Sequence, residues 1–342
     1  MNQIRILLCS LMAVWLMCSC TKDYRNVVPS SSIALLAIEP SQVSLPDMAG
    51  VGEMGLDLQS TVYGFELPNG SLGLVASVAD GNQTAAWLEQ YTGSAPVEKH
   101  GHRFAVSAEG FVFGLSDHAL LVMGPVDPSV RADTRRLMAK LLDSDEQPSS
   151  PLVDKLQTLS GPIALVARAT TLPQKYVAPL LVGAPKGVQA DKVLLAVTAS
   201  LTDDCLDVEG ELFSPNESVD KSLREAISCL RPMEGKLVSE LPDSAVFGLY
   251  VNVEGEKFLQ LLRTDKDLRM MLAGLDTETI RGIDGDAAFV LGADKQLHIS
   301  SNTSKGQEGS CRLVAVVNLQ QTGFDFVSRW LHGVRQVTYT MK

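Results

Sequence analysis

The sequence has 342 residues, of which 45% are hydrophobic and 20% are charged. This composition is typical of globular rather than disordered chains, and the length favours two or three modules over one small core. The formal net charge of −11 argues against a nucleic-acid partner, because neutralisation of phosphates supplies most of the affinity in such complexes.

The first residues have the pattern of a secretory signal. Arg5 precedes a short apolar run, and the small residue Ser19 stands directly before Cys20. The apolar run is too short for a membrane-spanning helix, which needs about 20 residues. The end of the segment is similar to the cleavage box of bacterial lipoproteins, which predicts removal of residues 1–19 and acylation of Cys20, for example with palmitate. A secreted protein cut near Cys18 is the alternative.

Residues 20–31 are predicted to form the lipidated cysteine and a polar tether, and residues 32–142 a first module. An Asn-Gly pair at 69–70, between two strand-like runs, is a strong hairpin signal. Asp80 is expected to cap a helix, with Gln83 reaching back to the cap. The expected strands are 32–38, 61–67, 71–78, 102–107, 111–115 and 119–123, and the expected helices are 80–90 and 128–142.

The acidic segment 143–151 contains two prolines and is predicted to be a linker. A middle segment, 152–240, follows. Within 205–213 apolar and acidic residues alternate, which indicates an antiparallel strand with one buried face. Pro215 is expected at the first position of a capped helix. The other expected elements are strands at 162–168 and 193–201 and helices at 152–159 and 173–181.

The last third, 241–342, is predicted to be a second copy of the first module. Four short matches occur in the same order, namely 28–33 with 241–246, 55–57 with 282–284, 74–76 with 313–315, and polar and aromatic residues of 80–88 with those of 318–331. The shared unit is a strand, a helix or loop, a hairpin, a capped helix and a strand. The middle segment follows a similar order without clear residue matches.

Strands joined largely by hairpins indicate an α+β fold with mainly antiparallel sheets and helices packed on one face. A doubly wound parallel fold would need strands and helices that alternate strictly, which this sequence lacks. The predicted architecture is therefore two related modules, the first and last thirds, on either side of a similar middle segment.

Residues 20–24 and 27–38 resemble the start of a family of Bacteroidota envelope lipoproteins known as domain of unknown function 4836, and residues 241–251 resemble it again. The resemblance implies membership, or a shorter relative, and a protein anchored to the outer membrane through lipid on its N-terminus. It supplies no catalytic residue. The segment 243–245, Asp-Ser-Ala, is similar to an O-glycosylation acceptor of these bacteria; the alternative is a turn that begins a strand.

The histidines are the first candidates for chemistry, because histidine is the commonest metal ligand. His100 and His102 share a face if their segment is extended, and His118 follows on a neighbouring hairpin. Catalytic zinc needs three convergent ligands, and nothing in the sequence fixes the third, so a solvated hairpin edge is the favoured interpretation. Ser116 and Asp117 are adjacent on a strand and therefore point to opposite faces, which argues against a catalytic triad there.

Trp87 and Trp330 occupy matching places in the predicted repeat and are weak candidates for binding a sugar or a partner. The favoured alternative is that each packs its helix onto its sheet. Cys205, Cys229 and Cys311 are odd in number and far apart, so no disulfide framework is implied. One bridge with one free thiol is the alternative to three free thiols.

The sequence thus predicts a lipid-anchored cell-envelope protein with a non-catalytic binding or structural role. Its partners would be the membrane, through the N-terminal lipid, and an unknown protein or glycan, with no cofactor and no nucleic acid. One alternative is an envelope hydrolase whose carboxylates meet only in the fold. Another is a surface adhesion or assembly subunit that uses exposed sheet edges.

Overall fold

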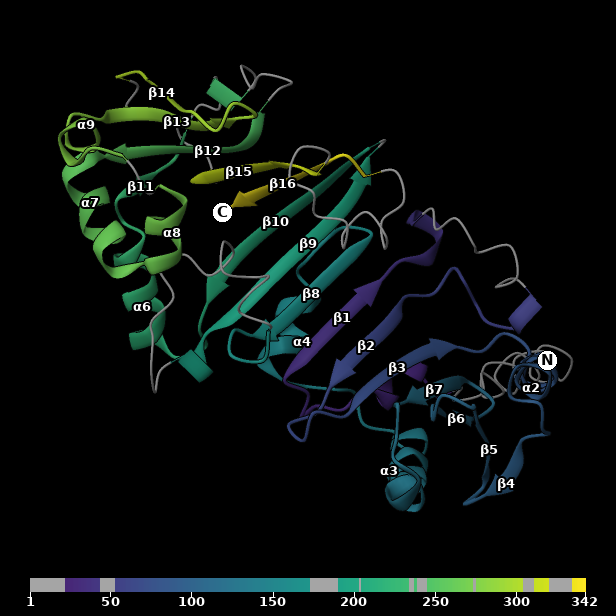
Figure 1. The fold of residues 1–342 in the computed structure, drawn as a ribbon. Helices are drawn as coiled ribbons and strands as arrows, with labels where there is room; N and C mark the ends of the chain where they lie inside the picture. Colours follow the sequence, from purple (N-terminus) through teal and green to yellow (C-terminus); the bar gives the residue numbers. More distant parts are fainter. Residues whose placement is uncertain are drawn as a thin grey trace, which may run out of the picture. The chain divides into compact units, whose positions relative to one another are not determined.

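The structure is a computed structural model of the chain (Figure 1). It describes residues 22–43, 53–172, 190–202, 204–233, 237–238, 245–272, 275–303, 311–319 and 334–342. The fold is α+β with mostly antiparallel strands. Among the described residues, no helix combines the length and the hydropathy needed to cross a bilayer.

The described chain forms two compact units. Unit 1 takes its residues from Met1–Pro29, Pro46–Ser60 and Ser71–Pro148. Unit 2 takes its residues from Ser30–Leu45, Thr61–Gly70 and Ser149–Lys342.

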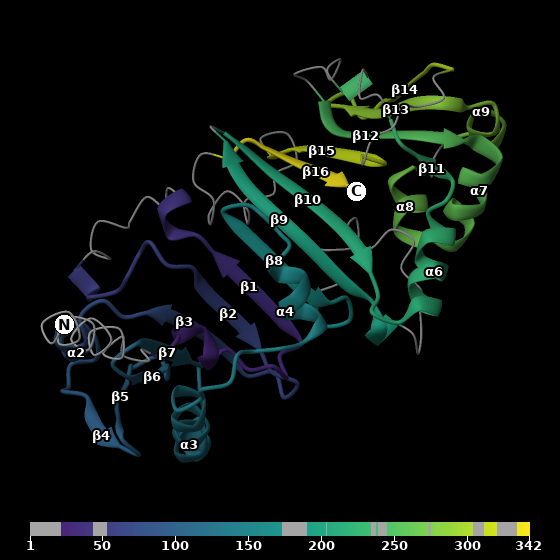
Figure 2. The same ribbon diagram turned by 180° about the vertical axis from the view of Figure 1, so that it is seen from behind.

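The sheet of unit 1 is fully antiparallel, with the strand order β3-β7-β6-β5-β4. Helices α2 and α3 and a 3-10 helix, η1, accompany it (Figures 1 and 2). The elements are η1 (Tyr24–Val27), β3 (Leu72–Ser77), α2 (Gly81–Thr92), β4 (Val97–Lys99), β5 (His102–Val106), β6 (Val112–Leu115), β7 (Ala119–Met123), η4 (Pro128–Val130) and α3 (Arg131–Leu142).

The two helices of unit 1 cover opposite faces of its sheet. Leu88 of α2 packs with Phe113 and Leu115 of β6. A side chain at Gly114, which points to the other face, would meet Leu142 and Met138 of α3 at 3.1 Å. The prediction of helices on one face is therefore wrong for this unit, because its central strands are apolar on both faces.

Helix α2 begins at the predicted cap. The Asp80 carboxylate accepts the backbone N–H groups of Asn82 and Gln83 at 2.9 and 3.0 Å. The side-chain amide of Gln83 does not reach back to the cap. It donates to the Glu53 carbonyl at 3.1 Å, because Glu53 belongs to a segment that lies against the start of the helix.

The predicted tether is part of the packed body from Lys22 onwards. The Asp23 carboxylate accepts the Arg25 backbone N–H at 2.9 Å and so begins η1. Val27 is fully buried and Val28 nearly so. This apolar pair, in a segment that is otherwise polar, explains why the chain packs here instead of remaining a solvated linker.

The sheet of unit 2 has the strand order β14-β13-β12-β15-β16-β10-β9-β8-β1-β2, with β11 paired to β12. Among the described pairings, only β10 with β16 is parallel. Its strands are β1 (Ala34–Ile38), β2 (Val62–Glu66), β8 (Ile163–Arg168), β9 (Leu194–Thr202), β10 (Cys205–Phe213), β11 (Leu230–Arg231), β12 (Ala245–Glu254), β13 (Asp284–Gly292), β14 (Leu297–Ser301), β15 (Leu313–Asn318) and β16 (Gln336–Met341).

The helices of unit 2 connect and cover these strands. They are η2 (Pro40–Gln42), α4 (Pro151–Leu156), η6 (Ala190–Lys192), α6 (Glu217–Ala226), α7 (Gly255–Thr264), α8 (Lys266–Met271) and α9 (Thr277–Arg281). Helix α6 starts after an Asn216 cap, so Pro215 lies before the helix and not at its first position. The predicted helix 173–181 lies outside the described residues.

The main core of unit 2 lies where α7 packs on β12 and β13. The rings of Phe258 and Phe289 are fully buried and stack with centroids 6.3 Å apart. Gly255 begins α7 in close contact with α9, where an added Cβ would lie 2.0 Å from the Ile280 carbonyl oxygen. Only glycine fits at this contact.

The predicted duplication is not reflected in the strand pairing. The sequence matches equate β3 with β15 and β1 with β12, so a duplication would pair β3 with β1 as β15 pairs with β12. Instead, β1 pairs with β2 and β8. Gly55 and Gly282, matched in the sequence, have φ angles of +70° and −72°. What does recur in unit 2 is an antiparallel triplet, in β8-β9-β10 and again in β12-β13-β14.

The boundary between the units, at 148/149, falls inside the predicted linker 143–151. The predicted first module, 32–142, is nevertheless divided between the units. Strands β1 and β2 belong to unit 2, because all five residues of β1 pair with β8 on one side and with β2 on the other. The strands of 152–240 and 241–342 share one sheet instead of forming separate modules.

The packing of η1 gives a first prediction. We expect Val27→Ala to lower the free energy of unfolding by about 2 kcal/mol, because a fully buried side chain loses its contacts and leaves a cavity. Val130→Ala is a matched control, since Val130 is 47% exposed and should change stability by less than about 0.5 kcal/mol. Urea denaturation measures both. Equal stability of the two variants would show that the segment after Cys20 does not contribute to the fold.

Candidate functional site

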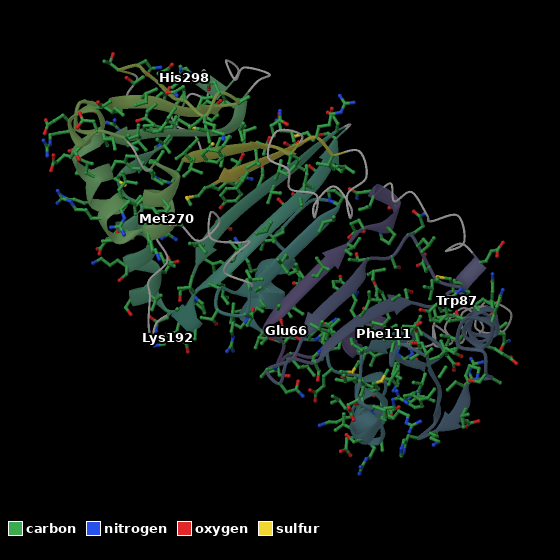
Figure 3. All side chains as sticks on the ribbon, in the orientation of Figure 1. Glu66, Trp87, Phe111, Lys192, Met270 and His298 are labelled. Carbon is green, nitrogen blue, oxygen red and sulfur yellow. The ribbon has the colours of Figure 1, made fainter. Side chains whose placement is uncertain are left out.

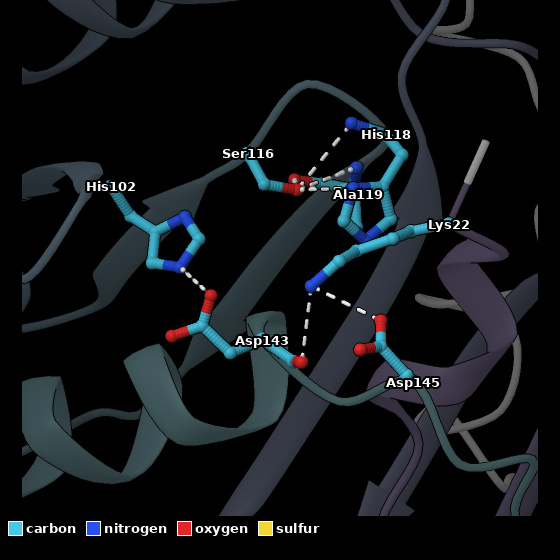
Figure 4. Close-up of polar contacts among 7 residues, drawn as sticks. All are labelled: Lys22, His102, Ser116, His118, Ala119, Asp143 and Asp145. Carbon is cyan, nitrogen blue, oxygen red and sulfur yellow. Dashed lines mark hydrogen bonds and ion pairs between the residues drawn. The ribbon is translucent and has the colours of Figure 1, made fainter. Parts of the chain in front are cut away.

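The turn between β6 and β7 and the end of α3 bring several polar groups together in unit 1 (Figure 4). His102 lies with its Nε2 atom 3.1 Å from the Asp143 carboxylate. The Lys22 ammonium donates to the Asp143 backbone carbonyl at 3.1 Å and pairs with Asp145 at 3.1 Å. Lys22, at the start of the described chain, is therefore bonded to the residues that follow α3.

Ser116 and His118 form a short contact in the same turn. The buried Ser116 hydroxyl oxygen lies 3.2 Å from His118 Nδ1 and accepts the Ala119 backbone N–H at 3.1 Å. His118 Nε2 is buried and has no hydrogen-bond partner. A serine nucleophile needs a base that a third group orients, and none lies at this nitrogen in the described chain. The serine therefore holds the turn between β6 and β7, and the prediction that it lies on a strand is wrong.

The three histidine candidates do not converge. His100 lies in the β4–β5 turn with a φ of +52°, so it is not extended and does not share a face with His102. His102 is directed to Asp143, and His118 to Ser116. No cluster of three or more potential ligands for a metal ion occurs among the described residues.

Burial lowers the pKa of His118, and the nearby charges of Lys22 and His102 act in the same direction. The unfolded chain therefore binds a proton at this residue more tightly than the folded one. The stability contributed by neutral His118 is present above a pH of about 6.5, its ordinary pKa, and is lost as the pH falls through the lowered pKa.

We therefore expect the free energy of unfolding to decrease from about pH 7.5 to about pH 5, and His118→Gln to reduce this decrease. His298→Gln serves as the control, because His298 is an exposed side chain on β14. Denaturant unfolding at a series of pH values gives the slopes. If His118→Gln kept the wild-type slope, burial of this ring would not control the pH dependence.

Trp87 packs α2 onto the sheet of unit 1. Its ring contacts the buried cluster under α2, stacks on Tyr91 at 5.2 Å and meets Phe113 edge-on at 6.5 Å. Trp87 and Phe111, which packs against the same cluster, are labelled in Figure 3. These contacts agree with the interpretation that Trp87 packs its helix onto its sheet, although the Tyr91 side chain that stacks on it is exposed. Trp330 lies outside the described residues, as do Cys20 and the first two residues of the segment 243–245.

The three cysteines of the body are unpaired. Burial raises the pKa of each thiol, in the case of Cys229 to about 11. Cys205 lies on the acidic face of β10, with its sulfur 3.4 Å from the Asp207 carboxylate. Raised thiol pKa values disfavour the thiolate and thus nucleophilic chemistry at these positions.

The described residues of unit 2 line two cavities that bear on function. The smaller, about 230 Å³, lies beside α4, where Lys155 pairs with Glu211 and Lys342 pairs with Glu209. The larger, about 390 Å³, is called here the serine-lined cavity. Its wall includes Ser30, Ser31, Ser32, Ser150, Arg168 and Lys192.

Neither cavity was predicted from the sequence. The serine-lined cavity is assembled from the segment before β1, the start of α4, the end of β8, η6 and the start of α6. These segments are far apart in the chain. The only local signals were the serine and proline residues before the two helices, which indicate helix starts but no cavity.

No family model matches the sequence, and no curated protein matches it. Membership of the lipoprotein family therefore stays a prediction. The solved structures similar to this chain include crystal form I of TP0453, with a TM-score of 0.39 and 14% identity over 61% of this chain and 87% of that one. Crystal form IV of TP0453 gives a TM-score of 0.37 and 15% identity over 54% and 77%. These similarities carry no inference about this chain.

Proposed function

We propose that this protein is a lipid-anchored protein of the cell envelope, held at the outer membrane through Cys20, whose body binds a ligand instead of catalysing a reaction. The anchor is supported by the sequence pattern before Cys20 and by the resemblance of residues 20–38 to envelope lipoproteins.

The observation that carries this proposal is the position at which the packed body starts. Lys22 is already bonded to Asp143 and Asp145, and Asp23 caps η1. Two residues of chain span at most about 7 Å. A lipid on Cys20 would therefore hold unit 1 next to the bilayer surface, without a long flexible spacer.

A binding role is supported by the use of the polar groups described above. The Ser116 hydroxyl holds a turn, His102 is directed to the acid at the end of α3, and Lys155 and Lys342 are both paired. The serine-lined cavity, in contrast, carries cationic side chains that remain open to a ligand. Its volume of about 390 Å³ lies within the usual range of small-molecule sites, about 300–1,000 Å³.

The anchor is tested with a pair of cysteine variants. We expect Cys20→Ala to abolish incorporation of labelled palmitate and to move the protein from the membrane fraction to the soluble fraction, because no other residue carries the lipid. Cys18→Ala is the matched control and should keep both the label and the membrane fraction. Labelling followed by membrane fractionation measures both effects. Palmitate on the Cys20→Ala variant would refute the proposed anchor.

A further inference from the structure

We propose that the serine-lined cavity binds a small sugar that carries one oxyanion, either a carboxylate or a phosphate. This inference rests on the proposed binding function and names its ligand class. Oxyanion recognition would come from Arg168 and Lys192, and hydroxyl recognition from Ser30, Asn216 and Asp191.

Three hydrogen bonds, one between backbone groups and two between a serine hydroxyl and the backbone, bring the segments of the wall together. The Arg168 N–H donates to the Ile33 carbonyl at 2.9 Å, which places the end of β8 beside the serines before β1. The Ser149 N–H donates to the Ser30 hydroxyl at 3.0 Å and so places the start of α4 there. A third bond, from the Ser214 hydroxyl to the Lys192 carbonyl at 2.8 Å, joins the start of α6 to η6.

The cationic side chains of the wall are the first argument for an anion. Within the described chain, neither the Arg168 guanidinium nor the Lys192 ammonium makes a hydrogen bond or an ion pair; Figure 3 labels Lys192. Other cations of this acidic protein, such as Lys155 and Arg281, are paired with carboxylates. Guanidinium and ammonium groups bind carboxylate and phosphate through charge-assisted hydrogen bonds, which are about twice as strong as neutral ones.

The neutral polar groups are the argument for a sugar. The Ser30 oxygen accepts the Ser149 N–H, which leaves the Ser30 hydroxyl hydrogen available for a ligand. The side-chain oxygen of Asn216 accepts the Val219 N–H, which leaves the amide N–H groups of Asn216 available. The Asp191 carboxylate accepts but does not donate, so it fits a ligand hydroxyl and not the oxyanion.

Calorimetric titration of the mature full-length protein tests this inference. The ligands are glucose 6-phosphate, glucuronate, glucose and inorganic phosphate. We expect at least one of the two anionic sugars to bind, and to bind at least tenfold more tightly than glucose or inorganic phosphate. A preference between the two identifies the oxyanion.

Arg168→Gln and Lys192→Gln should each weaken binding of the preferred anionic sugar about tenfold, since each removes one charge-assisted contact. Arg263→Gln and Lys295→Gln are matched controls, because both side chains are exposed and neither lines the cavity. Both should bind as the wild type does. Thermal unfolding of every variant verifies that it is folded.

The inference is overturned if neither anionic sugar binds, if glucose or inorganic phosphate binds as tightly, or if the two cavity variants bind as the controls do. Calorimetric titration of the Cys20→Ala variant with the same sugars tests the ligand class separately from the lipid anchor. Binding by that variant together with its release from the membrane supports both proposals. Membrane release without sugar binding supports the anchor alone and overturns this ligand class.

Discussion

The pairing of β1 with β8 is the interaction on which the arrangement of unit 2 depends. Five consecutive residues, 34–38, form a ladder with β8 on one side and with β2 on the other, although β8 lies far along the chain. The preceding residues 22–28 pack in unit 1, so the chain passes from one unit to the other between residues 29 and 30. The pairing of β1 with β8 also brings Ser32 to the end of β8, where Arg168 lies. These residues form one wall of the serine-lined cavity.

Periodicity along the sequence predicted local structure well, because the alternation that identifies a strand is a property of the strand itself. The α+β class, the turn at 69–70 and the strands β6, β7, β9 and β10 follow from such local patterns. Pairing partners are set by contacts between distant residues, which local patterns do not contain. The apolar runs in β3 and β15 look alike because both are internal strands, and this similarity produced the duplication that the pairings do not share.

The candidate sites show the same limit. The sequence identified His102 and His118 as polar groups near hairpin ends, and the structure places both around the end of α3. It could not show that His100 lies in a turn with positive φ, which directs it away from a shared ligand set. Arg168 and Lys192 were ordinary surface cations in the sequence. They became candidates only when the fold placed them in one cavity without carboxylate partners.

Charge balance explains why such a cavity would select its ligand. A formal charge of −11 disfavours the approach of anions to the protein as a whole. Arg168, Lys192 and Asp191 together leave one positive charge at the cavity, which a carboxylate neutralises and a phosphate monoester, with a charge of about −1.5 to −2 at pH 7, exceeds. A ligand with several anionic groups would bring uncompensated charge close to Asp191, whereas a neutral sugar would leave both cations unpaired. Attraction at the cavity and repulsion over the rest of the surface therefore favour a ligand with a single anionic group, and a carboxylate over a phosphate.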